Sequence, residues 1–351
     1  MAKTLMDRQG TYPRLAALAA RLFGLGALAW AGLAHAQTVT VYTDDFEGGV
    51  SGWSVNADST TTPTTRYLGR FDNSPNATSR TLALPEGTER VEIQFDFYKF
   101  DSWDNTAQWG FDRFQVDVDG TQIFSLPFSS DQAARSGTNG NVDWSHSPQG
   151  PPAQLVYGSG QSWLTDQFHT VNLTVDDPGT SLDLTLRTAL NQGGNDESGG
   201  FDNFSVVAHL APPVIAAQKS VGLEAGSHYL PGETVEYTIA LSNTGGPTEA
   251  GSIVIVDPLP ANATVFTGDF DGAGNAVAFA DDASSASGLA CCAGTTVEFS
   301  DTTSGAPVFG YVPNGGFDPA VTHLRIAPTG AVRDARSDAA DMSFSFRARI
   351  E

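Results

Sequence analysis

Apolar and polar residues alternate along much of the chain, and the clearest stretch runs from residue 91 to residue 98. One set of alternate positions is apolar, namely Val91, Ile93, Phe95 and Phe97. The other set carries Glu92, Gln94, Asp96 and Tyr98. A period of two places successive side chains on opposite faces of a strand. We therefore expect a strand with one face in a core and the other facing solvent or a groove.

Comparable patterns predict further strands in the first half of the chain. Strands at 114–118 and 121–124 flank Asp119-Gly120, and an Asp-Gly pair between β-rich runs is a strong hairpin signal because Gly adopts the positive φ of the turn. The remaining strands predicted in this half span residues 169–175, 182–186 and 201–207. The polar stretch 129–160, which contains Gly and Pro, is expected to be an excursion between strands.

The pattern resets at Ala211-Pro212-Pro213, because two prolines stop a strand ladder and stiffen a short connection. Alternating strands follow at 234–241 and 344–350, with a nearly continuous apolar strand at 253–256. After residue 36 there is no long apolar stripe with a period of 3.6 residues. These features predict an all-β protein with one β-sandwich in each half. The two domains are expected to span residues 37–210 and 211–351.

The first 36 residues have a different character. Four basic residues (Lys3, Arg8, Arg14, Arg21) precede an apolar run from Leu22 to Leu33, which is followed by Ala34-His35-Ala36. A basic leader, about a dozen apolar residues and an A-x-A end are the three parts of a secretory signal peptide. The run is shorter than the roughly 20 residues of a membrane span, so an uncleaved anchor is the less favoured alternative. We predict cleavage after Ala36 and an extracytoplasmic location: secreted, cell-surface or periplasmic.

Charge narrows the classes of partner. The chain has 18 basic and 40 acidic residues, a net charge of −22, and removal of the leader would make this −25. Such a surface repels nucleic acid and anionic lipid, because phosphate contacts need clustered Lys and Arg. No later segment is apolar for 18 residues, so we expect no integral membrane association after signal cleavage. Oligomeric state is left open.

The two cysteines, Cys291 and Cys292, are neighbours, and the chain has no C-x-x-C pair for zinc or redox chemistry. Adjacent cysteines can form a strained ring in an oxidising compartment or remain as thiols. A catalytic role for them is not expected.

The second half resembles the bacterial surface module called the conserved repeat domain (domain of unknown function eleven). Four blocks in order carry the resemblance: Lys219-Ser220, Pro231 to Ile239, Leu241 to Gly245, and Val256 to Asn262. It covers about residues 214–351. The resemblance implies an immunoglobulin-like sandwich, often found in secreted or surface-attached proteins, with no enzymatic activity.

The first half more loosely resembles bacterial jelly-roll modules of the lectin-like and carbohydrate-binding kind. The blocks that carry this resemblance are Asp45 to Glu47 with Gly52-Trp53, Tyr67 to Phe71, Phe95 to Tyr98 with Asp101 to Asn105, and Asp196 to Val206. It covers about residues 40–208 and implies a fold more firmly than a ligand.

Oxygen-rich groups make calcium the first candidate ligand, because Ca²⁺ binds six to eight carboxylate, amide and carbonyl oxygens. There are three such groups: Asp44/Asp45/Glu47, Asp101/Asp104/Asn105 with Asp112, and Asp196/Glu197 with Asp202/Asn203. The first and last strands of a jelly roll are sheet neighbours, so the first and third groups are expected to converge on one structural ion. The resemblance supports calcium there, because such modules often carry it. The predicted ligands are Asp45, Glu47, Asp196, Glu197 and Asp202. The alternative is that Asp, Asn and Gly gather in turns for backbone reasons.

A glycan is the second candidate ligand, because sugar sites pair aromatic platforms with carboxylates and amides. Trp103 and Trp109 lie in a segment without core periodicity, where an exposed indole would be unusual. The predicted ligand-binding residues are Tyr98, Asp101, Trp103, Asp104, Asn105 and Trp109. The alternative is that most of these aromatic side chains fill the sandwich core.

Catalysis is disfavoured by spacing. Glu92 and Asp96 share a strand face but lie roughly 13 Å apart along it, whereas a retaining glycosidase needs carboxyl groups about 5–5.5 Å apart. We therefore expect a non-enzymatic binding or adhesion protein, calcium-stabilised, with a polysaccharide or surface glycan as its ligand. The immunoglobulin-like domain would space or dock the jelly roll. A purely structural component of an extracellular matrix or surface layer is the alternative, and a glycoside hydrolase is less favoured.

Overall fold

The computed structural model describes residues 29–30, 37–60, 65–129, 132–153, 164–224, 228–282 and 286–351. Contacts divide the chain into two compact units, Ala36–Ala211 and Pro212–Glu351 together with Met1–His35. We call them the N-terminal and C-terminal units. Except for Ala29–Trp30, the predicted signal peptide lies outside the described residues. Those two residues form β1, which pairs with β18 (Ile255–Pro258).

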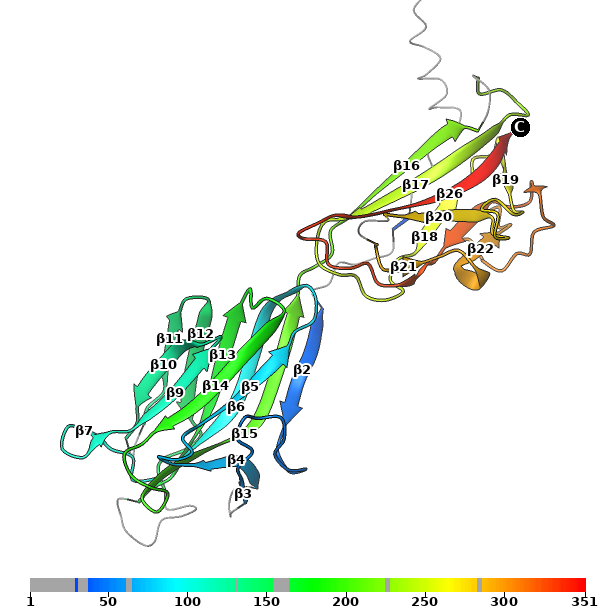
Figure 1. Ribbon diagram of the computed structural model, residues 1–351. Coiled ribbons are helices and arrows are strands. Elements are labelled where there is room, and N and C mark those ends of the chain that lie inside the picture. The colour runs from blue at the N-terminus through cyan, green and yellow to red at the C-terminus, as the bar shows by residue number, and fades with distance from the viewer. Residues whose placement is uncertain are drawn as a thin grey trace, which may run out of the picture. The chain divides into compact units, whose positions relative to one another are not determined.

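The N-terminal unit is a jelly-roll β-sandwich of two antiparallel sheets (Figure 1). The smaller sheet has the order β10 (Thr121–Pro127), β9 (Arg113–Val118), β14 (Ser181–Ala189), β5 (Ala77–Ala83). The larger sheet has the order β11 (Arg135–Asn139), β12 (Val142–Pro148), β13 (Gln167–Asp176), β6 (Thr88–Asp101), β15 (Glu197–Leu210), β4 (Arg66–Phe71), β3 (Asp58–Thr60). A further strand, β2 (Thr38–Asp44), pairs with the second part of β15.

Aromatic side chains fill the space between these sheets. The predicted inward face of β6 is confirmed, since Val91, Ile93, Phe95 and Phe97 are all buried in the core. Phe97 stacks on Phe114 of β9 with ring centroids 4.1 Å apart. The predicted hairpin is confirmed as well, because Asp119 and Gly120 have φ values of 49° and 73° between β9 and β10.

The prediction for residues 129–160 was partly wrong, because this stretch contains β11 and β12. Both strands add to the edge of the larger sheet, where Trp144 packs against the core. Their sequence is rich in Ser, Thr, Asn and Gly and lacks an apolar alternation. Edge strands bury only part of one face, so they leave a weaker pattern than β6 does.

Strand β15 contains a bulge near its middle. Its ladder with β6 shifts register between Asp202 and Ser205, and Asn203 adopts a positive φ of 52°. Phe201 and Phe204 both point into the core although they are three residues apart. The extra residue therefore changes which alternate positions face inward along this strand.

The C-terminal unit is an immunoglobulin-like sandwich. One sheet has the order β16 (Ile215–Leu223), β17 (Thr234–Asn243), β26 (Ala340–Ile350), β19 (Ala263–Phe266), β23 (Phe317–Asp318), and β20 (Val277–Asp281) also pairs with β26. The other has the order β1, β18, β24 (His323–Ile326), β22 (Val297–Ser300). Smaller elements are β21 (Leu289–Ala290), β25 (Thr329–Gly330) and the 3-10 helix η1 (Gly294–Thr296).

The last strand follows its prediction, because Phe344, Phe346, Ala348 and Ile350 of β26 are all buried. Strand β18 begins at Ile255, two residues later than predicted. Cys291 and Cys292 form a disulfide, which resolves the alternative that the sequence left open.

A buried ion pair crosses the core between the two sheets of the C-terminal unit. Nζ of Lys219 on β16 lies 2.7 Å from Oδ1 of Asp257 on β18, and their side chains are 3% and 0% exposed. The ammonium group also lies 4.5 Å from the ring centroid of Tyr237. Burial raises the pKa of Asp257, and Lys219 opposes that rise. The pair is therefore held by mutual attraction in apolar surroundings.

Candidate functional site

A short hairpin extends from the N-terminal unit between β6 and β9. It consists of β7 (Asn105–Thr106) and β8 (Gly110–Phe111), and its tip projects away from the sandwich (Figure 1). Trp109 and Phe111 are 59% and 50% exposed. Large aromatic side chains are normally buried, so two of them on one projecting hairpin form an unusual surface. Asn191 supports the tip by donating a 2.6 Å hydrogen bond from Nδ2 to the Trp109 carbonyl.

Two aspartates close the base of this hairpin. The Asp112 N–H donates to the Asp104 carbonyl at 2.8 Å, and the Asp104 N–H donates to Asp112 Oδ2 at 2.5 Å. Glu197, the first residue of β15, adds a third carboxylate from a distant part of the sequence. One ligand oxygen from each of Asp104, Asp112 and Glu197 lies within 4.8 Å of the other two. We call these three residues the acidic triad.

The acidic triad is poorly compensated by the protein. The side chains of Asp112 and Glu197 are fully buried, and Asp112 Oδ1 and Glu197 Oε1 have no hydrogen-bond partner among the described residues. Burial, then repulsion from Asp112, raises the pKa of Glu197 to about 8. Burial also raises the pKa of Asp112 and of Asp104. The site therefore favours uptake of positive charge, either as protons or as a cation.

A buried lysine next to the site does not pair with the acidic triad. Lys99 is fully buried, and its Nζ donates to the carbonyl oxygens of Asp101 at 2.8 Å and Thr165 at 2.6 Å. Burial lowers the pKa of Lys99 to about 8. Asp101 is engaged elsewhere, because its Oδ2 accepts a 3.0 Å bond from Arg70 Nη2. The nearby basic side chains, Lys99 and Arg70, thus bond to Asp101 and Thr165 and form no ion pair with the acidic triad.

The residues predicted to bind a glycan fall into two sets. Trp103 is only 1% exposed, and its indole donates a 2.9 Å hydrogen bond to the Ser198 carbonyl. The expectation that it is exposed was wrong, because it packs in the sandwich core against Phe97 and Phe128. Tyr98 and Asp101 are buried as well. In contrast, Asn105 and Trp109 lie at the exposed hairpin, with Asp104 half-buried at its base.

The five residues predicted to share a calcium ion are not brought together as one set. Among the described residues, the only group of three or more candidate ligands is the acidic triad, which contains Glu197 but not Asp45, Glu47, Asp196 or Asp202. The reason is that the third oxygen-rich group lies along β15, and five residues of strand separate Glu197 from Asp202 by about 17 Å.

Each remaining member of the predicted calcium set has another partner. Asp196 Oδ1 accepts from the Ser102 hydroxyl at 2.7 Å. Asp202 Oδ2 accepts from the Tyr98 hydroxyl at 2.8 Å. Glu47 Oε1 accepts from the Arg66 N–H at 2.7 Å, and Asp45 Oδ1 accepts from the Glu47 N–H at 3.2 Å. The contact of Asp45 is the kind of turn role that the sequence analysis kept as its alternative. That of Asp202 is a side-chain bond between neighbouring strands.

Sequence reasoning missed two contributors to the hairpin site. Phe111 was not singled out, although it follows Trp109 by two residues in the same segment without core periodicity. Asp112 was grouped with Asp101 and Asp104 but not chosen as a ligand. Its position directly after Gly110-Phe111, eight residues from Asp104, is the spacing of two strand ends joined by a short hairpin.

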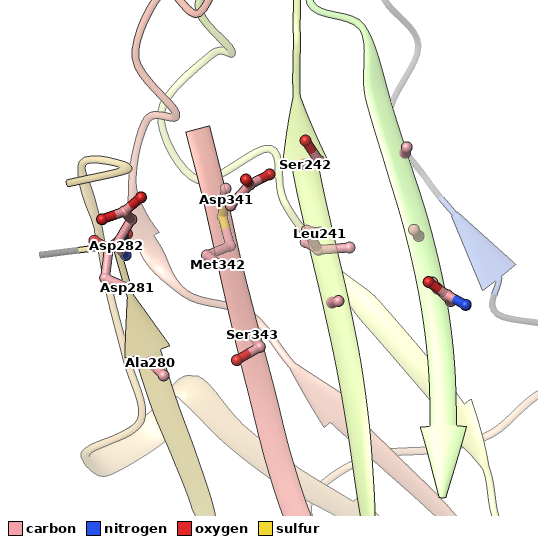
Figure 2. Close-up of a pocket in the computed structure, with 12 residues that line it drawn as sticks. Leu241, Ser242, Ala280, Asp281, Asp282, Asp341, Met342 and Ser343 are labelled. Carbon is pink, nitrogen blue, oxygen red and sulfur yellow. Dashed lines mark hydrogen bonds between the residues drawn. The ribbon is translucent and has the colours of Figure 1, made fainter. Parts of the chain in front are cut away.

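The C-terminal unit has a shallow groove across β16, β17, β26 and β20 (Figure 2). Alanines and serines form much of its lining, and three carboxylates lie toward one end, those of Asp281, Asp282 and Asp341. Both oxygens of Asp281 accept hydrogen bonds from Ser287. Among the described residues, the three carboxylates of the groove do not form a group close enough to hold a metal ion together.

No protein-family model matches this chain, and no curated protein does. Among solved structures, dimeric latent PorU from Porphyromonas gingivalis matches with 11% identity and a TM-score of 0.31, over 91% of this chain and 21% of that one. This chain thus spans about a fifth of that protein.

Two further structures are similar at a lower level. The N-terminal CBM22-1-CBM22-2 tandem domain from Paenibacillus barcinonensis Xyn10C matches with 12% identity and a TM-score of 0.25, over 92% of this chain and 91% of that one. The structure of Sulfolobus Turreted Icosahedral Virus matches with 10% identity and a TM-score of 0.21, over 92% and 77%. Likenesses at these scores carry no argument about function, which must come from the geometry of the site.

Among the described residues, no helix is long and apolar enough to cross a membrane.

Proposed function

We propose that this protein is a non-enzymatic, exported binding protein whose N-terminal unit recognises a glycan through the β7–β8 hairpin. The C-terminal unit, which resembles the conserved repeat domain, would space or dock it at a surface. The observation that carries the proposal is the exposed pair Trp109 and Phe111 at the hairpin tip.

The chemistry of the tip suits a sugar. Sugar rings have apolar faces that stack on aromatic side chains, and hydroxyl edges that bond to amides and carboxylates. Trp109 and Phe111 would supply the flat platform. Asn105, which lies opposite Phe111 in the hairpin, would supply an amide group for the sugar hydroxyls. The strongly acidic composition argues against nucleic acid as the alternative stacking ligand.

The experiment is retention on insoluble polysaccharides and binding to a glycan array. We expect Trp109→Ala to lose retention while the melting temperature stays within the error of the wild type, because the side chain contributes little packing. Val312→Ala is the matched control, since Val312 is also exposed but lies in the C-terminal unit. Wild-type protein that is retained on no glycan would refute the proposal. It would favour a purely structural role in a matrix or surface layer.

A further inference from the structure

We infer that Asp104, Asp112 and Glu197 form a calcium site that joins the base of the aromatic hairpin to the start of β15. This inference does not depend on what the hairpin binds. It differs from the calcium site predicted from the sequence in every ligand except Glu197.

The donor set of the acidic triad is that of a hard cation. All three donors are carboxylates, and the group contains no histidine or cysteine. Oxygen donors of this kind suit Ca²⁺, which also accepts main-chain carbonyls and waters in a flexible arrangement. Zn²⁺ prefers nitrogen and sulfur donors, and Mg²⁺ demands a strict octahedron and keeps most of its water.

The second observation is the state of the carboxylate oxygens. Both side chains are fully buried, and one oxygen of each, Asp112 Oδ1 and Glu197 Oε1, has no hydrogen-bond donor among the described residues. The other oxygens, Asp112 Oδ2 and Glu197 Oε2, accept from the main-chain N–H groups of Asp104 and Gln192. A buried carboxylate oxygen without a donor is costly, and the three carboxylates, whose ligand oxygens lie within 4.8 Å of one another, also repel one another when ionised. A divalent cation would remove both costs, because it would bind the oxygens that lack a donor and offset the repulsion between the carboxylates.

The alternative to a cation is a proton held between Glu197 and Asp112. The raised pKa of Glu197 describes that situation. Such a proton would join one oxygen of Glu197 to one oxygen of Asp112, and the Asp104 carboxylate would take no part in that hydrogen bond. A cation would instead engage all three side chains, including both that flank the hairpin.

The position of the site has a mechanical consequence. Asp104 and Asp112 are the last residues on either side of the hairpin, and a single main-chain bond, from the Asp112 N–H to the Asp104 carbonyl, joins them directly. Glu197 belongs to the sheet that forms one wall of the core. A bound cation would therefore clamp the hairpin to the sandwich, and the orientation of Trp109 and Phe111 would depend on it.

The test is thermal unfolding of the full chain in a chelator and in rising CaCl₂. We expect the melting temperature of the N-terminal unit to rise with calcium, by a constant increment for each tenfold increase above the dissociation constant. MgCl₂ at the same concentrations should produce a much smaller rise. Equal melting in chelator and in millimolar calcium would overturn the inference.

Glu197→Gln is the main variant, because glutamine keeps the size of the side chain and removes its charge. Above pH 8, where Glu197 is ionised, it should melt at a higher temperature than the wild type in chelator, since one repelling carboxylate is gone. At every pH it should lose the response to calcium. A variant that merely misfolds cannot be more stable in chelator. Asp104→Asn, at the half-buried rim, should weaken the calcium response with less effect on the core.

Asp45→Asn is the matched control, because Asp45 is an exposed aspartate of the calcium site that was predicted from the sequence. It should keep the full response to calcium. A response lost in Asp45→Asn but kept in Glu197→Gln would place the ion elsewhere and overturn the inference. Terbium offers a second readout, since it occupies calcium sites and luminesces when a nearby indole absorbs light. The Trp103 indole, bonded to the carbonyl of Ser198, is well placed to sensitise it.

Discussion

The two units of this protein bury charge in opposite ways. In the C-terminal unit, Asp257 and Lys219 form a pair of opposite sign, 2.7 Å apart. The other buried acid among the described residues of this unit, Asp318, accepts hydrogen bonds from the Tyr311 hydroxyl and two main-chain N–H groups. In the N-terminal unit, the fully or almost fully buried charged side chains are five acids against one base, Lys99: Asp101, Asp112, Asp166, Glu197 and Asp202.

This difference separates structural charge from charge that requires a ligand. A buried pair of opposite sign is complete within the chain, whatever its net contribution to stability. A surplus of buried carboxylates is complete only when protons or a cation are added. On this reasoning the buried pair of the C-terminal unit is neutralised within the chain, whereas the acidic triad of the N-terminal unit depends on pH and on ions.

The largest effect is expected from breaking the pair in the C-terminal unit. Asp257→Leu leaves the Lys219 ammonium buried without a partner, and should destabilise this unit by about 3–5 kcal/mol. The double variant Lys219→Met/Asp257→Leu should recover most of the loss. Urea unfolding, with the two units analysed as separate transitions, measures both. If the single and double variants were equally unstable, the ion pair would not be the reason for the loss.

A change of pH in chelator is expected to have an intermediate effect on the free energy of unfolding of the N-terminal unit. Folding raises the pKa of Glu197 from its ordinary value of 4.5 to about 8. The folded state therefore holds a proton that the unfolded state has released, and this contribution is fully present below pH 4.5. It is lost as pH rises to about 8, with a slope of at most about 1.4 kcal/mol per pH unit for one proton.

Calcium sharpens this test, because the ion replaces the proton. In chelator between pH 5 and pH 8, urea unfolding should show the stability of the wild type falling relative to that of Glu197→Gln. This comparison cancels the opposite contribution of His146 and His169, because burial lowers the pKa of these residues to about 4 and about 3 in both proteins. The difference between the two proteins should be much smaller in saturating calcium, and parallel profiles in chelator would contradict the assignment.

The smallest effect on stability is expected at the hairpin tip. Trp109→Ala should change the free energy of unfolding by no more than about 0.5 kcal/mol, because the side chain lies mostly in solvent. Trp103→Ala, six residues earlier, should cost about 3–5 kcal/mol because it empties a site in the core. Comparing the two variants by urea unfolding distinguishes the tryptophan that is exposed at the hairpin tip from the one that stabilises the core. Similar losses in both would mean that the tip packs against the fold.

The alternation along β6 and β26 was sufficient to predict both sandwiches, because a period of two fixes which side chains enter the core. The Asp119-Gly120 turn was equally clear, because the positive φ it needs is available to few residues. The strands of the larger sheet's edge were missed, because β11 and β12 have too few apolar positions to show a period.

The site was predicted only in part. Sequence showed that oxygen-rich groups and tryptophans gather between residues 101 and 112, but it did not show which of them leave the core. Trp103 and Trp109 look alike in sequence, and only the path of the chain through the hairpin separates them. Pairing Asp104 and Asp112 with Glu197 needed the register of β15 against β6, where Glu197 lies opposite Asp101.

The bulge at Asn203 sets the phase between the two ends of β15. Glu197 and Phe201 face inward by one count of alternate residues, and Phe204, Val206 and Ala208 by the other. Deleting Asn203 would remove the bulge and give the whole strand one alternation of inward and outward side chains. Either the apolar half or the carboxylate end could then face inward correctly, but not both. One added residue thus allows a single strand to contribute apolar side chains to the core from one half and a carboxylate to the acidic triad from the other.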